Sequence, residues 1–136
     1  MARKQKSNAD LILQMDIEGA EYRVLLESSD EILNKFRIIV IEFHHLNRLF
    51  EMSGFDLIDL TIRKLLKQFE IVHMHPNNCR EPVVHYGFSV PPVMEFTFLR
   101  KDRIKGISLG GVSPDRLDAP NVDGVNDVAL PSCWRL

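Results

Sequence analysis

The feature that most constrains the fold is a change of pattern between residues 10 and 28. An almost unbroken apolar run, Leu11–Leu13 with Met15, ends at Asp16, and Glu18 and Gly19 follow before a helical pattern begins. Such a run is typical of a strand covered on both faces, as strands of a parallel sheet are. The order predicts a strand that passes into a helix, with carboxylates at the carboxyl end of the strand. Ligands of open α/β sheets bind in the crevice outside these strand ends.

Similar patterns recur along the chain. Further strands are predicted at residues 37–43, 70–74 and 93–99. Helices are predicted at residues 19–28 and 55–69, with a short helix between them that Asp30 caps. Residues 75–79 are predicted to form a loop, with Ser53-Gly54 capping or bending the last helix and Val83-Val84 forming at most a minor strand. Alternating strands and helices predict an α/β fold with a parallel sheet. Because no helical pattern precedes residues 93–99, we expect this last strand to run antiparallel.

Composition excludes several classes of protein. The 136 residues fit one domain, and a net charge of −2 gives no reason to expect a nucleic-acid or membrane partner. Cys79 and Cys133 do not suggest a disulfide scaffold. Residues 1–9 are a polar lead-in without the apolar core of a signal peptide, and no apolar run is long enough to span a membrane. We therefore expect a soluble, cytoplasmic protein whose residues 105–136 form an irregular Gly/Pro/Asp-rich tail.

Four polar residues are predicted to converge from neighbouring strand ends. They are Asp16, Glu42, His44 and His75. Carboxylate and imidazole ligands of this kind would suit Mg²⁺, Mn²⁺ or Zn²⁺. The alternative is structural, because acids near a helix N-terminus can cap it and a histidine can simply face solvent. In that view Glu21 is a charge of the first helical turn.

Three further positions carry open alternatives. His75 has the chemistry of a general base, because its ordinary pKa lies near neutrality. Asn77 and Asn78 either make a turn or contact a substrate. Glu95 lies in the middle of an apolar strand, which predicts either a buried structural pair or a place in the site.

The motif Asp16-Ile17-Glu18-Gly19-Ala20-Glu21 and the strand ending at Glu42 resemble the FkbM family of S-adenosylmethionine-dependent methyltransferases. Residues 43–46, 73–79 and 93–98 resemble the same family in order and spacing. The resemblance implies a Rossmann-like methyltransferase sheet in which the strands of residues 10–104 correspond to the fourth to seventh, the last one antiparallel. It implies O-methylation of a small molecule or sugar by the complete enzyme. The implied catalytic residues are Asp16, Glu42, His75 and Glu95, and the implied substrate-binding residues are Glu18, His44, Asn77 and Asn78.

The chain also departs from the family pattern. No glycine-rich turn follows a strand, and no strand ending in an acid precedes Asp10, so no cofactor-binding residue is assigned. We expect residues 10–104 to be the carboxyl-terminal part of the domain, with weak or no binding of S-adenosylmethionine by this chain alone. One rival hypothesis is a non-catalytic fragment that associates with itself or a partner through an exposed edge strand at residues 11–15. A second rival is a small metal-dependent hydrolase that uses the Asp, Glu and His set.

Overall fold

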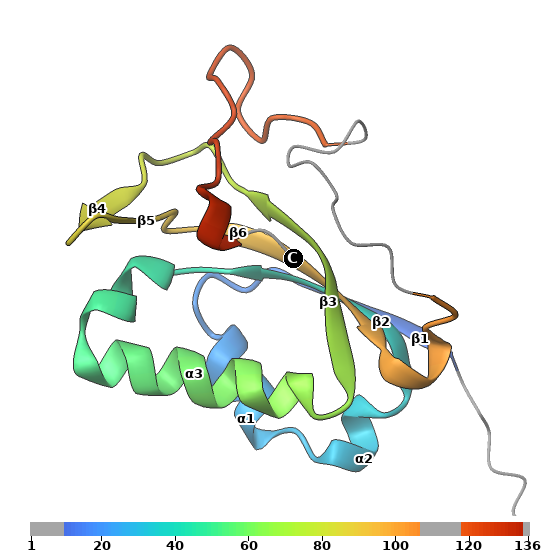
Figure 1. Cartoon of the computed structure of the whole chain (residues 1–136). Coiled ribbons are helices and arrows are strands. Elements are labelled where there is room, and N and C mark those ends of the chain that lie inside the picture. The colour runs from blue at the N-terminus through green and yellow to red at the C-terminus, as the bar shows by residue number, and fades with distance from the viewer. Residues whose placement is uncertain (1–9, 107–117, 135–136) are drawn as a thin grey trace, which may run out of the picture.

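The computed structural model describes residues 10–106 and 118–134 (Figure 1). Strand β1 (Leu11–Met15) leads through helices α1 (Glu21–Glu27) and α2 (Asp30–Leu33) to strand β2 (Phe36–Phe43). The 3₁₀ helix η1 (Leu46–Phe50) precedes α3 (Met52–Leu66) and β3 (Phe69–Pro76). A hairpin of β4 (Val83–His85) and β5 (Phe88–Val90) leads to β6 (Met94–Arg100). The short 3₁₀ helices η2 (Lys101–Arg103) and η3 (Ser132–Trp134) follow.

The main sheet has four strands in the order β1-β2-β6-β3. Strands β1 and β2 are parallel, and β6 lies between β2 and β3, antiparallel to both. The prediction that the last strand runs antiparallel is therefore confirmed. The register aligns Glu42 with Glu95 and Glu95 with His75, so these three side chains form a row across one face of the sheet.

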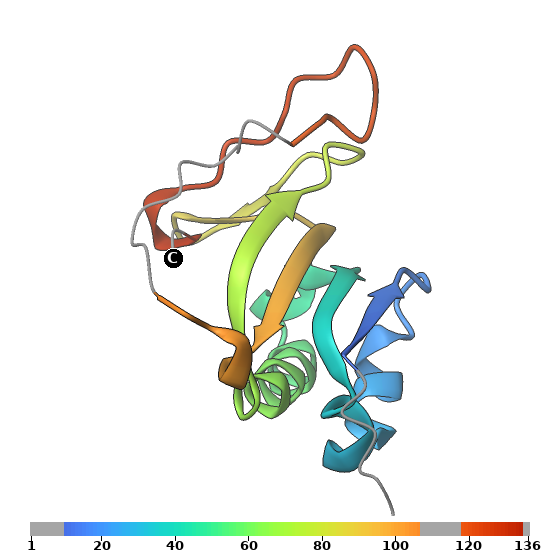
Figure 2. The ribbon, with the colours of Figure 1, turned by 90° about the vertical axis from the view of Figure 1, so that its right-hand side faces the viewer.

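The core lies on the opposite face. Alternate residues of the central strands are buried there, including Ile41 of β2 and Phe96 and Phe98 of β6. Helices α1 and α3 contact each other, and Figures 1 and 2 show the helices gathered along this side of the sheet. None of the described helices is long and apolar enough to cross a membrane.

Several predicted boundaries are wrong. Ser29, not Asp30, caps α2, because its hydroxyl accepts a hydrogen bond from the Ile32 amide at 3.3 Å. Helix α3 begins three residues earlier than predicted and contains Gly54, while Phe69 already belongs to β3. His75 and Pro76 extend β3 rather than form a loop, because β6 continues to pair beside them.

The segment that follows β3 is more ordered than its composition indicated. Residues 83–90 form a two-stranded hairpin whose turn residues Tyr86 and Gly87 have φ angles of 48° and 82°. Two successive positive φ angles are typical of the type I′ turn that matches the twist of paired strands. The predicted irregular tail is described over residues 105–106 and 118–134, where η3 is its regular element, whereas residues 1–9, 107–117 and 135–136 lie outside the described residues.

Candidate functional site

Four side chains meet where β1 and β2 end. Pairing of Met15 with Ile41 places the residues that follow these two strands next to each other. Asp16 and Glu18 come from the loop after β1, Glu42 is near the end of β2, and His44 follows that strand. The carboxyl ends of two parallel strands thus bring together four of the eight residues that the sequence singled out.

His44 is the centre of this cluster. It is only 8% exposed, and its Nδ1 lies 3.0 Å from Oε1 of Glu21. On the other side of the ring, Nε2 lies 3.5 Å from Glu18 Oε2 and 3.7 Å from Asp16 Oδ1. A third carboxylate oxygen, Oε1 of Glu42, is 3.9 Å from the same nitrogen. One ring nitrogen is therefore anchored, and the other faces three acids.

Glu21 is the functional candidate that the sequence interpretation missed. It lies in the first turn of α1, as predicted, but it is fully buried there. Its Oε1 accepts hydrogen bonds from the backbone amides of Ile17 and Gly19, both at 3.1 Å, in addition to its contact with His44. The loop that carries Asp16 and Glu18 is thereby folded around the Glu21 carboxylate. The sequence did hold a signal for this role, because Glu21 is the third acid of the Asp16–Glu21 motif.

The backbone adopts unusual conformations in the two loops that carry the cluster, one after β1 and one after β2. Glu18 and Gly19 have φ angles of 56° and 102°, and His45 has a φ of 59°. Only a glycine adopts the conformation of residue 19 without strain, and a Cβ there would lie 3.0 Å from the His45 ring. The Tyr22 hydroxyl donates to the His44 carbonyl at 2.7 Å. Burial raises the pKa of Tyr22, and the adjacent Glu21 charge adds to this effect, so the phenol stays protonated.

The two asparagines have different roles. Asn77 joins the cluster, because its amide nitrogen donates to Glu42 Oε1 at 2.8 Å. Its own oxygen accepts from the Cys79 amide, which makes the predicted turn. Asn78 is 5% exposed, and its amide group is already bonded to the backbone of Val122 and Val125.

His75 and Glu95 are not brought into contact with His44. His75 is 8% exposed, and its Nε2 lies 3.6 Å from Asp127 Oδ1, too far for a hydrogen bond. The strand carrying Glu95 separates His75 from Glu42, so the backbones of these two residues are about 10 Å apart. The predicted four-residue convergence is therefore realised for Asp16, Glu42 and His44 but not for His75.

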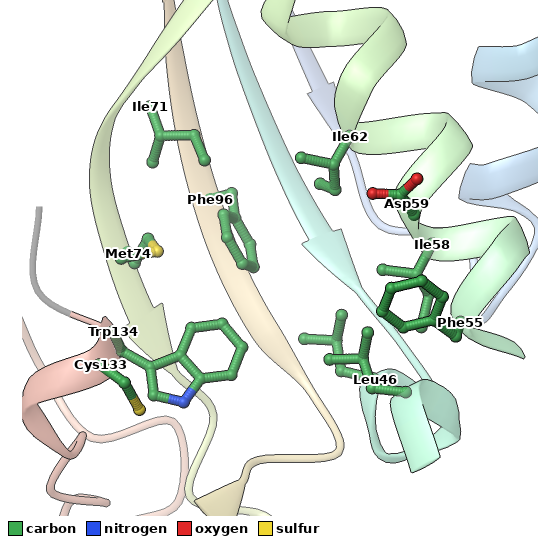
Figure 3. Close-up of a pocket in the computed structure, with 11 residues that line it drawn as sticks. Leu46, Phe55, Ile58, Asp59, Ile62, Ile71, Met74, Phe96, Cys133 and Trp134 are labelled. Carbon is green, nitrogen blue, oxygen red and sulfur yellow. The ribbon is translucent and has the colours of Figure 1, made fainter. Parts of the chain in front are cut away.

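An apolar pocket of about 330 Å³ lies elsewhere, on the helix side of the sheet. Figure 3 shows Ile58 and Ile62 of α3 facing Met74 and Phe96, with Trp134 at the lower end. The Trp134 indole nitrogen donates to the Ser89 carbonyl at 3.1 Å, which attaches η3 to β5. Ten of the eleven lining residues carry no charge and the exception is Asp59, so the pocket offers mainly shape and apolar surface.

A comparison with protein families assigns the chain to a family. Residues 1–69 match the model of the methyltransferase FkbM domain, which is just over half of the chain. The chain therefore belongs to the FkbM methyltransferase family. The matched segment contains Asp16, Glu18, Glu21, Glu42 and His44. Comparisons with curated proteins and with solved structures gave no match.

Proposed function

We propose that this chain forms the acceptor side of an S-adenosylmethionine-dependent methyltransferase that methylates an oxygen of a small molecule or sugar. The observation that carries the proposal is the family match over the segment that builds the His44 cluster. Sheet order supports it, because β1, β2, β3 and β6 can be taken as the fourth, fifth, sixth and seventh strands of a Rossmann-like methyltransferase sheet. In such sheets, ligands bind beyond the carboxyl ends of parallel strands.

The proposed roles concern the acceptor. A hydroxyl oxygen that is methylated must lose its proton, and a carboxylate beside it can accept that proton. Asp16 is our choice for this role, because its side chain is 55% exposed at the mouth of the cluster. Glu42 and Asn77 would orient the acceptor, and the more exposed Glu18 would contact it from the outside. His75 is the weaker candidate for the base, since its ring is buried against Asp127.

S-adenosylmethionine would supply the methyl group. Within residues 10–106 and 118–134 there is no glycine-rich turn between a strand and a helix of the kind that admits a nucleotide cofactor. These residues therefore offer no cradle that fits the cofactor, and we assign none of them to its binding. The part of the reaction that the described residues can perform is to hold the acceptor and take up its proton.

Transfer of a labelled methyl group tests this function. The native gene product, with its mass determined intact, is incubated with methyl-labelled S-adenosylmethionine and a panel of sugars and small alcohols. We expect labelled methyl ether and a loss of about 10²-fold or more in Asp16→Asn, the usual contribution of a general base. Asp56→Asn, on the exposed side of α3, is the matched control and should keep full activity. Label found on nitrogen, or equal activity in both variants, would contradict the proposal.

A second candidate function is association through β1. This strand pairs with β2 along one edge, and no described strand covers its other edge. Leu11 is 47% exposed and Ile12 is 67% exposed there. An open edge with apolar side chains is a template for pairing with another chain. A non-catalytic protein could use the same edge to bind a partner or a second copy of itself.

A further inference from the structure

We infer that Asp16, Glu18 and His44 bind one divalent cation, and that Glu21 positions His44 for it. The ligand atoms of the first three residues lie within 4.8 Å of one another. If the proposed function holds, this cation would also bind the acceptor oxygen, but the inference depends on the geometry of the cluster alone.

The orientation of the imidazole points to a ligand. Glu21 Oε1 lies 3.0 Å from Nδ1, so this nitrogen is engaged inside the protein and Nε2 is the ring nitrogen that faces Asp16, Glu18 and Glu42. The His44 side chain is 10% exposed, and its Nε2 faces the three carboxylates at 3.5 to 3.9 Å without a short hydrogen bond to any of them. A ring nitrogen that faces three carboxylate oxygens at these separations is arranged to share one cation with them.

The distances suit a common ion. Nε2 lies 3.5 Å from Glu18 Oε2 and 3.7 Å from Asp16 Oδ1, which is too long for good hydrogen bonds. Two ligands at about 2.1 Å from one ion are about 3 Å apart at a right angle and about 4.2 Å apart when opposite. The separations of 3.5 Å and 3.7 Å from Nε2 to Glu18 and Asp16 both lie between these two values. Glu42 Oε1, at 3.9 Å, is close enough to serve as a further oxygen ligand.

Glu21 contacts the ring nitrogen of His44 that faces away from the proposed cation, as the outer partner of a histidine ligand does. Histidine ligands usually donate their other ring N–H to a carboxylate, which fixes the tautomer and the direction of the ring. The Glu21 carboxylate does this while also accepting from the Ile17 and Gly19 amides in the loop that carries the two acids. One buried side chain thus sets the separation between the imidazole and the carboxylate ligands. A mixed oxygen and nitrogen set of this kind suits Mn²⁺ or Zn²⁺.

The main rival explanation is that His44 is a doubly protonated imidazolium paired with the acids. A titration with Mn²⁺ separates the cation site from this rival. The full chain is first treated with a chelator, Mn²⁺ is then added, and free Mn²⁺ is monitored through its paramagnetic resonance signal. We expect one tight site per chain, and competition by Zn²⁺. Glu18→Gln should weaken it about tenfold or more without loss of fold, because the Glu18 side chain is 86% exposed. Glu27→Gln, also on an exposed acid, should leave it unchanged.

The positioning role of Glu21 has its own readout. Glu21→Gln should weaken Mn²⁺ binding 10- to 100-fold, the usual effect of losing an outer partner of a histidine ligand. Circular dichroism establishes whether that variant is folded, and Glu18→Gln keeps the inference testable if it is not. Absence of binding by Mn²⁺, Zn²⁺ and Mg²⁺, with both His44 nitrogens protonated in nitrogen NMR spectra at neutral pH, would overturn the inference. Methyl transfer can fail while the cation still binds, so the two proposals fail separately.

Discussion

One carboxylate oxygen of Glu21, at the start of α1, is bonded to the Ile17 amide, the Gly19 amide and the His44 ring. A buried carboxylate is tolerated only when such partners replace water, and their removal leaves two backbone amides and an imidazole without an acceptor. Glu21→Ala should therefore lower the free energy of unfolding by about 3 kcal/mol, the scale of losing hydrogen bonds to a charged group. Urea denaturation measures this. Glu27→Ala, at the exposed end of the same helix, should change it by about 0.5 kcal/mol or less, and an equal effect in both variants would contradict the buried role.

Gly54 is required by close contact between α3 and η1. A Cβ at this position would lie 2.3 Å from the Arg48 carbonyl oxygen and 2.6 Å from the Arg48 Cβ. Helix propensity alone would favour alanine by about 1 kcal/mol, so propensity and packing predict opposite signs. Because backbone atoms are involved, we expect packing to dominate and Gly54→Ala to destabilise the fold by about 2 kcal/mol. Thermal unfolding decides this, with exposed Ser53→Ala as the control. A stabilised Gly54→Ala variant would show that η1 moves freely.

Arg100 joins three elements at the end of the sheet opposite to the His44 cluster. Its guanidinium donates to the Asn34 and Phe36 carbonyls beside the start of β2. It also donates to Asp10, just before β1, and to Asp102 in η2. Hydrogen bonds from Arg103, then from Arg100, hold the pKa of Asp10 below its usual range. The hydrogen bond from Arg100 lowers the pKa of Asp102 in the same way.

These lowered pKa values predict the direction of a pH effect. A carboxyl whose pKa is lower in the folded state contributes stability above its unfolded pKa, which is 3.8 for both, and loses it as the pH falls through the folded value. The wild-type chain should therefore lose stability below about pH 4. Arg100→Met should be less stable at pH 7 and should show a smaller drop on acidification. Urea midpoints at several pH values measure both effects. A drop as steep in Arg100→Met as in the wild type would assign acid sensitivity to other groups.

Asn78 fastens the carboxyl-terminal segment to the end of β3. Its amide exchanges hydrogen bonds with the backbone of Val122 and donates to the Val125 carbonyl, at 2.8 to 3.1 Å. Asn78→Ala should remove these three bonds at a cost of about 2 kcal/mol and release the segment locally. Limited proteolysis should then cut within residues 118–134 much faster than in the wild type. Asn121→Ala changes an exposed residue of the same segment and should not alter the cutting rate. Equal rates in the two variants would show that other contacts hold the segment.

How far the sequence predicts each element depends on the range of the interactions that define it. Apolar runs located β1 and β2, and the missing helix before β6 predicted its direction, because these signals are local. The end of β3 was missed, because pairing with β6 extends the strand through His75 and Pro76, and only then does the predicted turn at the two asparagines follow. Glu21 was predicted as a charge of the first helical turn, but its burial and its bond to His44 were not, since His44 lies 23 residues away. Similarly, the acceptors of Asn78 are 44 and 47 residues further along the chain.

At the scale of the whole molecule, the helices protect one face of the sheet, while the β1 edge stays open. Natural sheets usually protect such an edge with charge, proline or a covering segment. Here Ile12 is 67% exposed on β1, and no described strand pairs beyond it. This edge is therefore suited to add a strand from another chain.

The open β1 edge predicts association that depends on concentration and on one exposed side chain. The wild-type chain should form dimers or larger species as its concentration rises, measured by light scattering and sedimentation. Ile12→Lys places a charge on the open edge and should shift the midpoint of association at least tenfold upward, because a charged edge resists strand pairing. Ile32→Lys makes the same change at a residue that is 47% exposed on α2, away from the edge, and should associate like the wild type. A wild-type chain that stays monomeric at all concentrations, with rapid amide exchange along β1, would exclude self-pairing through this strand.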